Sequence, residues 1–328
     1  MRIPTVARSM VVAGFLSLVA GTVLAALTDE ERYQLADEAA AGNAASLTAL
    51  RQAAELGDAG AQSILGIMYV EGRGVPEDHN EAAGWFRKAA EQGFAEAQSN
   101  LGYAFEQGDG VRKDLAQAAE WYRKAAEQNH LPAQVALAGM YETGAGVKKN
   151  DKEAGRWYGS AANQGDEFAQ FRLGRLYADG RGVNLDLAEA TSWYRKAAEQ
   201  GFGPAQNELG LCYERGQGVA VDFPEAVKWY RLSAEQGFAL GQYNLGVSYV
   251  FGRGNPKDMT AAMKWFRLAA EQGLVPAQVN LGRGYENGDG VPKDTAEAAA
   301  WYRKAAEAGD ANAKKALTKL QKSGVLSK

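Results

Sequence analysis

The hydrophobic positions of this chain repeat with a period of 36 residues. A tryptophan returns at this interval in seven consecutive units, and a Leu-Gly pair returns in six of them, with Leu137-Ala138 as the one variant. The two series are Leu65-Gly66, Leu101-Gly102, Leu137-Ala138, Leu173-Gly174, Leu209-Gly210, Leu245-Gly246 and Leu281-Gly282, and Trp85, Trp121, Trp157, Trp193, Trp229, Trp265 and Trp301. A fixed period of about 20 to 50 residues is typical of a solenoid, in which each unit buries its apolar face against its neighbours. The pattern therefore predicts one elongated array of repeated units.

Each unit contains the pattern of two helices. Leu, Gly and Tyr at positions i, i+1 and i+4 form the apolar stripe of a first helix, which ends at a Gly-x-Gly pair such as Gly108 and Gly110. Asp or Asn followed three residues later by Glu or Gln, as at Asp114 and Gln117, resembles a capping box that begins a second helix. The glycine after the leucine costs about 1 kcal/mol of helix propensity relative to alanine, so we expect a neighbouring helix to approach the backbone there.

The N-terminal segment has the features of a secretory signal. Arg2 and Arg8 precede an apolar run, and Val23-Leu24-Ala25 offers small residues at a cleavage position. We expect cleavage of residues 1–25, which leaves no stable membrane span, and export of the chain. The alternative is that the run is retained as an anchor, since about 17 to 25 apolar residues can span a bilayer.

The repeats divide the rest of the chain into three segments. Residues 26–57 read as an incomplete pair of helices that caps the array, because an end repeat has one face without a neighbour. Residues 58–309 hold the seven full units, and residues 310–328 carry a lysine-rich capping helix and a tail.

Charge and cysteine content exclude several classes of protein. The formal net charge is −4, and loss of the two arginines of the signal takes it to −6. A nucleic-acid-binding protein carries a basic stripe, which is missing here. Cys212 is the only cysteine, so an oxidising compartment brings no internal disulfide, and its place between Leu209 and Tyr213 indicates a packing residue.

The sequence contains no constellation that predicts chemistry. The Gly-x-Gly loops follow helices, whereas a phosphate-binding fingerprint follows a strand, and their aspartates lack the oxygen ligands of an EF-hand. His79 and His130 lie in different units without partners for a triad or a zinc site. We therefore predict no catalytic residues, no cofactor, no metal and no enzymatic activity.

The repeated pattern closely resembles that of the Sel1-like repeat proteins, relatives of the tetratricopeptide repeats. The match is A-Q-x-x-L-G-x-x-Y-x-x-G-x-G-V-x-x-D, followed by A-x-x-W-Y-R-K-A-A-E-Q-G, over residues 58 to 315. The resemblance implies an all-α fold, a right-handed α-solenoid of antiparallel helix pairs. It also implies an exported bacterial adaptor, periplasmic or secreted, that binds a protein or peptide in a concave groove.

Two other functions follow from the same resemblance. One cysteine-rich branch of the family is linked to binding or hydrolysis of β-lactams, but its paired cysteines are missing here. Peptidoglycan binding without hydrolysis is the other alternative to the adaptor.

The resemblance also implies which residues face a partner. In tetratricopeptide relatives the concave face is lined by the first helix at two positions before the leucine, two after it, and five to six after it. This spacing and the residues that vary between units give Tyr103, Phe168, Phe171, Arg175, Leu240, Tyr243, Val247, Val250, Phe251, Arg283 and Glu286.

The helix that contains residues 240–251 is apolar on nearly every side, which is unusual for a surface helix. Two explanations fit this pattern. The apolar face docks a peptide or a partner helix, or it is buried against the chain itself or against a second copy of the chain.

Overall fold

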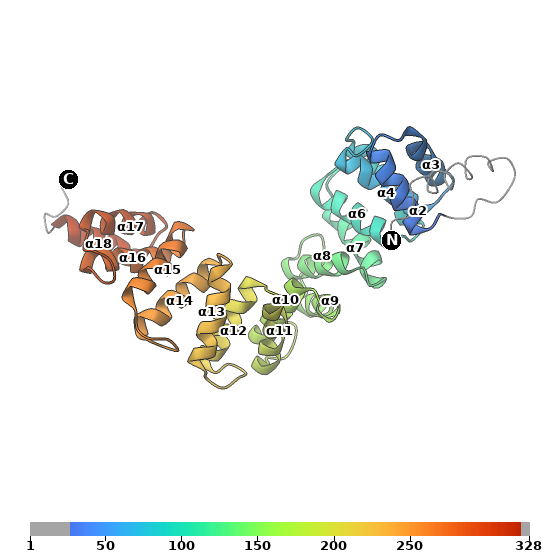
Figure 1. Cartoon of the computed structure of the whole chain (residues 1–328). Coiled ribbons are helices and arrows are strands. Elements are labelled where there is room, and N and C mark those ends of the chain that lie inside the picture. Colours follow the sequence, from blue (N-terminus) through green and yellow to red (C-terminus); the bar gives the residue numbers. More distant parts are fainter. Residues whose placement is uncertain (1–26, 323–328) are drawn as a thin grey trace, which may run out of the picture. The chain divides into compact units, whose positions relative to one another are not determined.

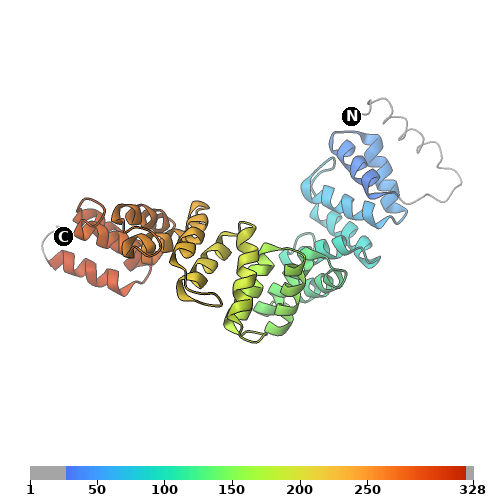
Figure 2. The same ribbon diagram turned by 60° about the horizontal axis from the view of Figure 1, so that its bottom comes forward.

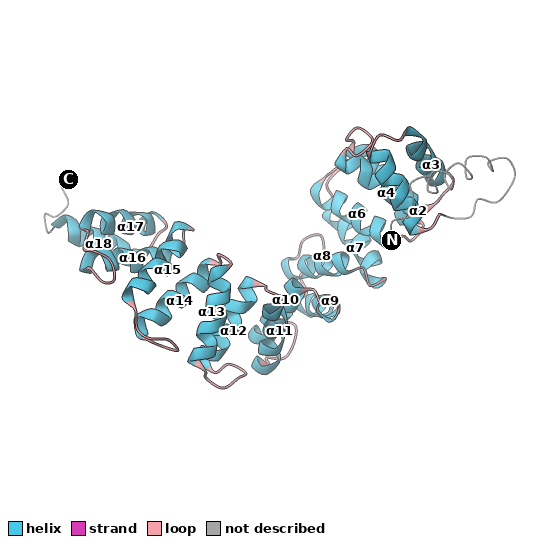
Figure 3. Ribbon diagram, in the orientation of Figure 1, coloured by secondary structure: helices cyan, strands magenta, loops and turns pink. Residues whose placement is uncertain are grey.

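The computed structural model describes residues 27–322, where it contains seventeen helices and no strand (Figures 1 and 3). The predicted all-α repeat fold is confirmed. The predicted signal, residues 1–25, and the end of the tail lie outside the described residues. The chain divides into two compact units, which meet between Gln128 and Asn129.

The first unit begins with the short capping pair and continues with two full repeats. Helices that follow one another in sequence pack together, and the first helices α2 and α4 also touch. The helices are α2 (Asp29–Ala40), α3 (Ala44–Glu55), α4 (Ala59–Glu71), α5 (His79–Glu91), α6 (Ala95–Gln107) and α7 (Leu115–Glu127).

The second unit contains five full repeats and the C-terminal capping helix. Figure 2 shows its helices in consecutive antiparallel pairs, and α12 also contacts α14, the next first helix. The first helices are α8 (Leu131–Thr143), α10 (Glu167–Asp179), α12 (Gly203–Arg215), α14 (Ala239–Phe251) and α16 (Val275–Asn287); the second helices are α9 (Asp151–Asn163), α11 (Leu187–Glu199), α13 (Phe223–Glu235), α15 (Met259–Glu271) and α17 (Thr295–Glu307), and α18 (Ala311–Lys322) follows.

The second helices begin at the predicted Asp or Asn caps, but the capping box is only half formed. The side chain of Asp114 accepts hydrogen bonds from the backbone of Ala116 and Gln117. Its own N–H donates to the carbonyl of Phe105 on the preceding helix, at 2.9 Å, rather than to the Gln117 side chain. The side chain of the third residue therefore has no part in the cap, and Asp258 still caps α15 by accepting from the N–H of Ala261.

The glycine after each core leucine is a point of close contact between the two helices of a repeat. A Cβ on Gly102 would lie 2.9 Å from the ring of Tyr122, and a Cβ on Gly282 would lie 2.7 Å from the ring of Tyr302. Helix α6 can approach α7 this closely only because residue 102 has no side chain. The expected approach of a neighbouring helix at these glycines is confirmed.

The Gly-x-Gly loops connect each repeat to the one before it. Gly216 ends α12 in the left-handed conformation, with φ of 70°. Gly218 also has positive φ, and a Cβ there would collide with the carbonyl oxygen of Leu187 at the start of the previous second helix. These glycines thus act in packing, which supports their structural interpretation over a phosphate-binding one.

A ladder of buried glutamines fastens neighbouring repeats along the opposite edge. Gln206 of α12 is buried, and its Nε2 donates to the carbonyl of Ala198 at 3.2 Å. Its Oε1 accepts from Nε2 of Gln236, which follows the second helix of the same repeat, at 2.8 Å. The arrangement returns at Gln62 with Gln92, Gln98 with Gln128, Gln134 with Gln164, Gln170 with Gln200, and Gln242 with Gln272.

Candidate functional site

The eleven residues predicted for partner binding all lie on first helices, and they differ in exposure. Tyr103 belongs to α6 of the first unit and the other ten to the second unit. Tyr103, Phe168, Arg175, Leu240, Phe251 and Arg283 are exposed, whereas Phe171, Tyr243, Val247, Val250 and Glu286 are partly buried.

Helix α14 presents a line of apolar side chains. Leu240, Val247 and Phe251 are separated by seven and four residues, so they lie on one side of the helix. Leu240 is 41% exposed and Phe251 is 62% exposed. The guanidinium of Arg253 lies 5.1 Å from the centroid of the Phe251 ring and covers part of it. The first-helix face is our name for the surface formed by Leu240, Val247 and Phe251 together with the residues at the same positions of other repeats, Phe168, Arg175 and Arg283.

Three of the apolar residues predicted on α14 pack within the solenoid. The rings of Tyr243 and Phe266 have centroids 5.6 Å apart. Tyr243, Val247 and Val250 all pack against the core cluster formed by α15 to α18, and Val247 is thus only partly open to the first-helix face. Helix α14 is thus apolar nearly all round because one flank covers the next repeat while another lies in the first-helix face. Burial against the chain itself therefore explains one flank of α14, and docking of a partner on the exposed flank stays a prediction.

Val250 and Glu286 occupy the same repeat position, and the residue type there varies together with the residue sixteen positions later in the second helix of the same repeat. Where the first helix carries Glu, the second carries Tyr sixteen residues later, and the hydroxyl donates to the carboxylate. Where the second helix has Phe266 or Phe86, the first helix has Val250 or Val70 at this position, and Ala178 stands sixteen residues before Tyr194. The hydrogen-bonded pairs are Tyr122 with Glu106, Tyr158 with Glu142, Tyr230 with Glu214, and Tyr302 with Glu286.

Aromatic side chains cluster at the start of α10. The centroid of the Phe202 ring lies 6.3 Å from that of Phe168 and 5.4 Å from that of Phe171. Phe171 also lies 5.9 Å from Tyr194. Phe171 is therefore held by its neighbours on two sides, and Phe168, 40% exposed, is the member that reaches the first-helix face.

Two charged residues beside this cluster were missed by the sequence reasoning, Arg172 and Glu208. Arg172 forms an ion pair with Glu142, and its guanidinium lies 5.9 Å from the ring centroids of both Tyr158 and Phe168. Arg172 and Glu208 occupy the same position, just before the core leucine, where other units have Ile64, Asn100, Ala136, Asn244 and Asn280. The variation at this position was the available signal.

Environment shifts the two carboxyl groups in opposite directions. Burial disfavours the charged form of Glu142, but hydrogen bonds from Arg172 and Tyr158 and the charge of Arg181 outweigh it and hold the pKa of Glu142 below its ordinary value. For Glu208, burial dominates over the attraction of Arg175 and raises the pKa of the carboxyl above its ordinary value.

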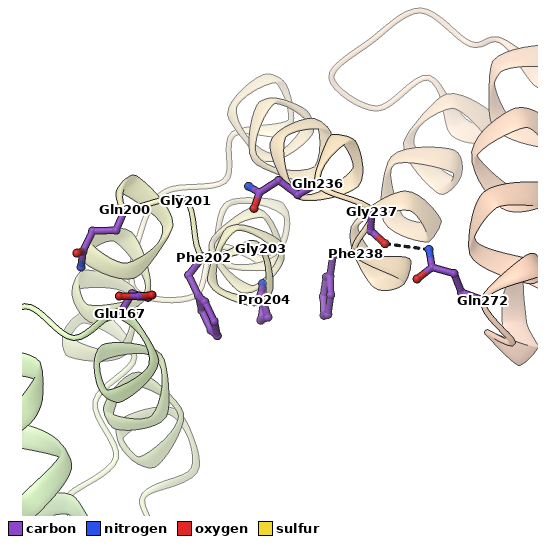
Figure 4. A pocket seen from close by; sticks show the side chains of 10 residues that line it. All are labelled: Glu167, Gln200, Gly201, Phe202, Gly203, Pro204, Gln236, Gly237, Phe238 and Gln272. Atoms are coloured by element: carbon purple, nitrogen blue, oxygen red, sulfur yellow. Dashed lines mark hydrogen bonds between the residues drawn. The ribbon is translucent and has the colours of Figure 1, made fainter. Parts of the chain in front are cut away.

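A pocket of about 470 Å³ lies at the turns that join α11 to α12 and α13 to α14. Figure 4 shows the side chains of Phe202, Pro204 and Phe238 side by side and pointing the same way, with Pro204 between the rings. The remaining lining residues are Glu167, Gln200, Gly201, Gly203, Gln236, Gly237 and Gln272. None of the ten is among the residues predicted for partner binding.

Cys212, His79 and His130, which were considered for chemistry, lie in separate places in the structure. Cys212 is 5% exposed and packs in a core cluster with Leu209, and burial raises the pKa of its thiol. His79 is partly buried, with its Nε2 3.1 Å from Oε1 of Glu77, and burial lowers the pKa of His130. Within residues 27–322 no three His, Cys, Asp or Glu side chains are grouped to hold a metal ion, and no helix there is both long and apolar enough to cross a bilayer.

Comparison with protein families accounts for these repeats. The family model described as the Sel1 repeat matches seven consecutive stretches, residues 59–94, 95–130, 131–166, 168–202, 203–238, 239–274 and 275–310. The chain belongs to the Sel1 repeat family. Proteins of this family are helical scaffolds that commonly serve protein interaction and are typically non-catalytic. A comparison with curated proteins finds no match.

Two solved structures are similar over most of this Sel1 repeat chain. The first is c5321, a protective antigen present in uropathogenic Escherichia coli strains, with 36% identity and a TM-score of 0.81 over 88% of this chain. This chain spans 64% of the length of that protein. The second is a Sel1 repeat protein from Oxalobacter formigenes, with 32% identity and a TM-score of 0.72 over 96% of this chain and 92% of its own.

Proposed function

We propose that this protein is a non-catalytic adaptor of the bacterial envelope and that its first-helix face binds a protein or peptide partner. The observation that carries the proposal is the exposure of Phe168, Leu240 and Phe251 on one side of the first helices. The residues common to all repeats are occupied in packing, in the glutamine ladder and in helix ends. Large apolar side chains that vary between units and stay exposed are the features of a binding surface.

Export is part of this proposal. It rests on the signal-like sequence of residues 1–25 and on the single buried cysteine, which needs no reducing compartment. Fractionation of cells that express the tagged full-length chain tests it. The tag is expected in the periplasm or the medium, with a mass lowered by the signal, and an intact chain in the cytoplasm would contradict export.

The binding face can be tested with a matched pair of leucines. Leu240 is 41% exposed on first helix α14, and Leu268 is 43% exposed on second helix α15. In the second helices of four other units, the position of Leu268 holds Lys88, Lys124, Lys196 or Lys304. Leu268→Lys is therefore compatible with the fold, and Leu240→Lys places the same charge on the proposed face.

The experiment is chemical cross-linking in envelope extracts, with the captured proteins identified by mass spectrometry. We expect a partner that Leu240→Lys and Phe251→Ala release and that Leu268→Lys retains. Equal capture by all variants would contradict the assignment of the face, and cross-links only between copies of the chain would replace the adaptor with a self-associating protein. Hydrolysis of nitrocefin by the purified chain, which we do not expect, would favour the β-lactam alternative.

A further inference from the structure

The pocket between the turns of the second unit offers hydrogen-bond acceptors to a ligand. Both amide hydrogens of Gln200 are engaged, because Nε2 donates to the carbonyl of Gly165 at 2.9 Å and to Oε1 of Gln170 at 2.8 Å. Nε2 of Gln272 likewise donates to Gly237 at 2.8 Å and to Gln242 at 2.9 Å. The glutamine ladder thus turns the amide nitrogens inward, and the Oε1 atoms of these exposed side chains remain to accept hydrogen bonds.

Glu167 is the one charged residue among those that line this pocket. The four turns around it, residues 161–171, 197–207, 233–243 and 269–279, contain no Lys or Arg, and their acidic residues are Asp166, Glu167, Glu199, Glu235 and Glu271. All of these carboxylates except Asp166 are exposed. Asp166 is already engaged, since its side chain accepts from the N–H of Ala169 as the cap of α10. The nearby Arg172 is held in its ion pair with Glu142, so the carboxylate of Glu167 favours a cation in the pocket.

Helix ends at the same edge contribute partial charges of both signs. Helices α12 and α14 begin at Phe202 and Phe238 without a side-chain cap, which leaves partial positive charge there. Helices α11, α13 and α15 end at Glu199, Glu235 and Glu271 beside them, with partial negative charge. These partial charges oppose one another, so the carboxylates decide the sign.

The walls of the pocket are the rings of Phe202 and Phe238, with Pro204 between them (Figure 4). A guanidinium stacks on aromatic faces and has five N–H donors in one plane, which suits carboxylate and amide oxygens. The protein uses the same contact elsewhere, because Arg253 lies 5.1 Å from the centroid of Phe251. Lysines also lie over rings in this protein, with Nζ of Lys196 3.6 Å from the centroid of Trp193, but an ammonium group has neither a planar face for stacking nor a planar set of donors for the oxygens around the pocket.

We propose that this pocket binds an arginine side chain of an extended basic peptide segment. The guanidinium stacks on the phenylalanine rings and donates to Oε1 of the glutamines and to the carboxylate of Glu167, and Pro204 contacts an apolar neighbour of the arginine. Glu235, exposed and next to Gln236 of the lining, adds attraction for the positive charge. This site is separate from the first-helix face and shares no residue with it. The protein would thus hold a partner at two surfaces of the second unit.

The test measures binding of a fluorescein-labelled peptide of three Arg-Pro repeats to the full-length chain by fluorescence anisotropy. The comparison peptides carry Lys or Glu in place of Arg. We expect the Arg peptide to bind about tenfold more tightly than the Lys peptide, and the Glu peptide not to bind, because the pocket offers ring faces and acceptors. Equal binding of the Arg and Lys peptides, or binding of the Glu peptide, would overturn the proposal.

Two pairs of variants place the peptide on the protein. Phe238→Leu gives the residue that stands at Leu274 in the next unit, and Glu235→Gln removes one charge. Both are expected to weaken binding of the Arg peptide about fivefold or more. The matched changes Phe94→Leu and Glu91→Gln occupy the same repeat positions in the first unit and are expected to leave binding unchanged.

An equal loss in all four variants would mean general attraction between a basic peptide and an acidic protein, and it would overturn the site. Phe251→Ala, at the far end of α14 on the first-helix face, is expected to leave binding of the Arg peptide within about twofold of the unmodified chain. The two proposals therefore fail separately, one in the cross-linking experiment and the other in this titration.

Discussion

The side-chain oxygen of Gln278 is buried without a hydrogen-bond donor in the described part of the chain, and Ala308 stands where six earlier repeats place the glutamine that supplies one. Nε2 of Gln278 still donates to the carbonyl of Ala270, at 3.2 Å. The glutamine ladder therefore reaches the last repeat without the second glutamine of the pair. The alanine at position 308 explains why the buried Oε1 of Gln278 has no donor.

Ala308→Gln is expected to complete the ladder and stabilise the C-terminal repeat. One added hydrogen bond to a buried acceptor contributes about 0.5 to 1.5 kcal/mol. Because solenoids can unfold repeat by repeat, the measurement is amide hydrogen exchange of α16 and α17 as well as the thermal midpoint. Ala308→Glu, which brings no amide donor, is the control. Equal protection in both variants would contradict the explanation.

The pairing of Tyr230 with Glu214 can be converted into the pairing of the next unit. The hydroxyl of Tyr230 donates to Glu214 at 2.6 Å, whereas the next unit has Phe266 and Val250 at these positions. Glu214→Val leaves the hydroxyl of a tyrosine that is only 2% exposed without its acceptor. We expect the double variant Glu214→Val with Tyr230→Phe to recover part of that loss, with a coupling energy of about 0.5 to 1.5 kcal/mol. Additive losses in thermal unfolding would show that the two positions are independent.

Several features of this fold follow from the repeat alone. Gly102 predicts a closely packed neighbouring helix, because glycine is unfavourable in a helix unless another group packs against its backbone. In the structure that group is the ring of Tyr122. The Asp caps could also be predicted from the sequence. The hydrogen bond from the N–H of Asp114 to the carbonyl of Phe105 could not be predicted, because it joins two helices whose distance the local pattern does not specify.

The candidate site was less predictable for the same reason. The spacing that placed Phe251 on an exposed face also selected Val250, which faces Phe266 across the repeat. Which residue of an apolar helix is covered depends on the angle of the next helix, and this angle is a property of the packing. The pocket lined by Phe202 and Phe238 was missed because these residues belong to the turns between repeats, and the spacing that selects partner-binding residues covers only the first helices.

Acid is expected to affect Glu142 and Glu208 in opposite ways. The pKa of Glu142 is lowered in the fold, so its contribution to stability is present above the unfolded-state pKa and is lost as the pH falls through the lower folded-state value. Glu142→Gln should therefore lower the thermal midpoint at pH 7, and its difference from the unmodified chain should shrink in acid.

For Glu208 the pKa is raised in the fold, so stability is greater below the unfolded-state pKa and declines as the pH rises through the higher folded-state value. Glu208→Gln is expected to raise the thermal midpoint at pH 7, and this gain should vanish near pH 4. Thermal scans between pH 3.5 and 7.5 measure both variants. A gain for Glu208→Gln that persists unchanged in acid would show that burial of the charge is not its cause.

Two glycines of the second unit should respond to alanine with opposite signs. A Cβ on Gly210 of α12 would lie 2.6 Å from two carbons of the Tyr230 ring, whereas a Cβ on Gly159 of α9 would meet no atom within 4 Å. Gly210→Ala forces the two helices of a repeat apart and is expected to destabilise the unit by about 1 to 3 kcal/mol. Gly159→Ala adds only helix propensity and should stabilise it by about 0.5 to 1 kcal/mol.

The third full unit already carries Ala138 in place of this glycine, so the fold can accommodate a methyl group where the surrounding repeat has adjusted to it. Gly210→Ala should therefore leave the protein folded, with a lowered thermal midpoint and faster hydrogen exchange in α12 and α13. If instead both variants raise the midpoint by similar amounts, helix propensity outweighs the contact with Tyr230, and the glycine is not required for close packing.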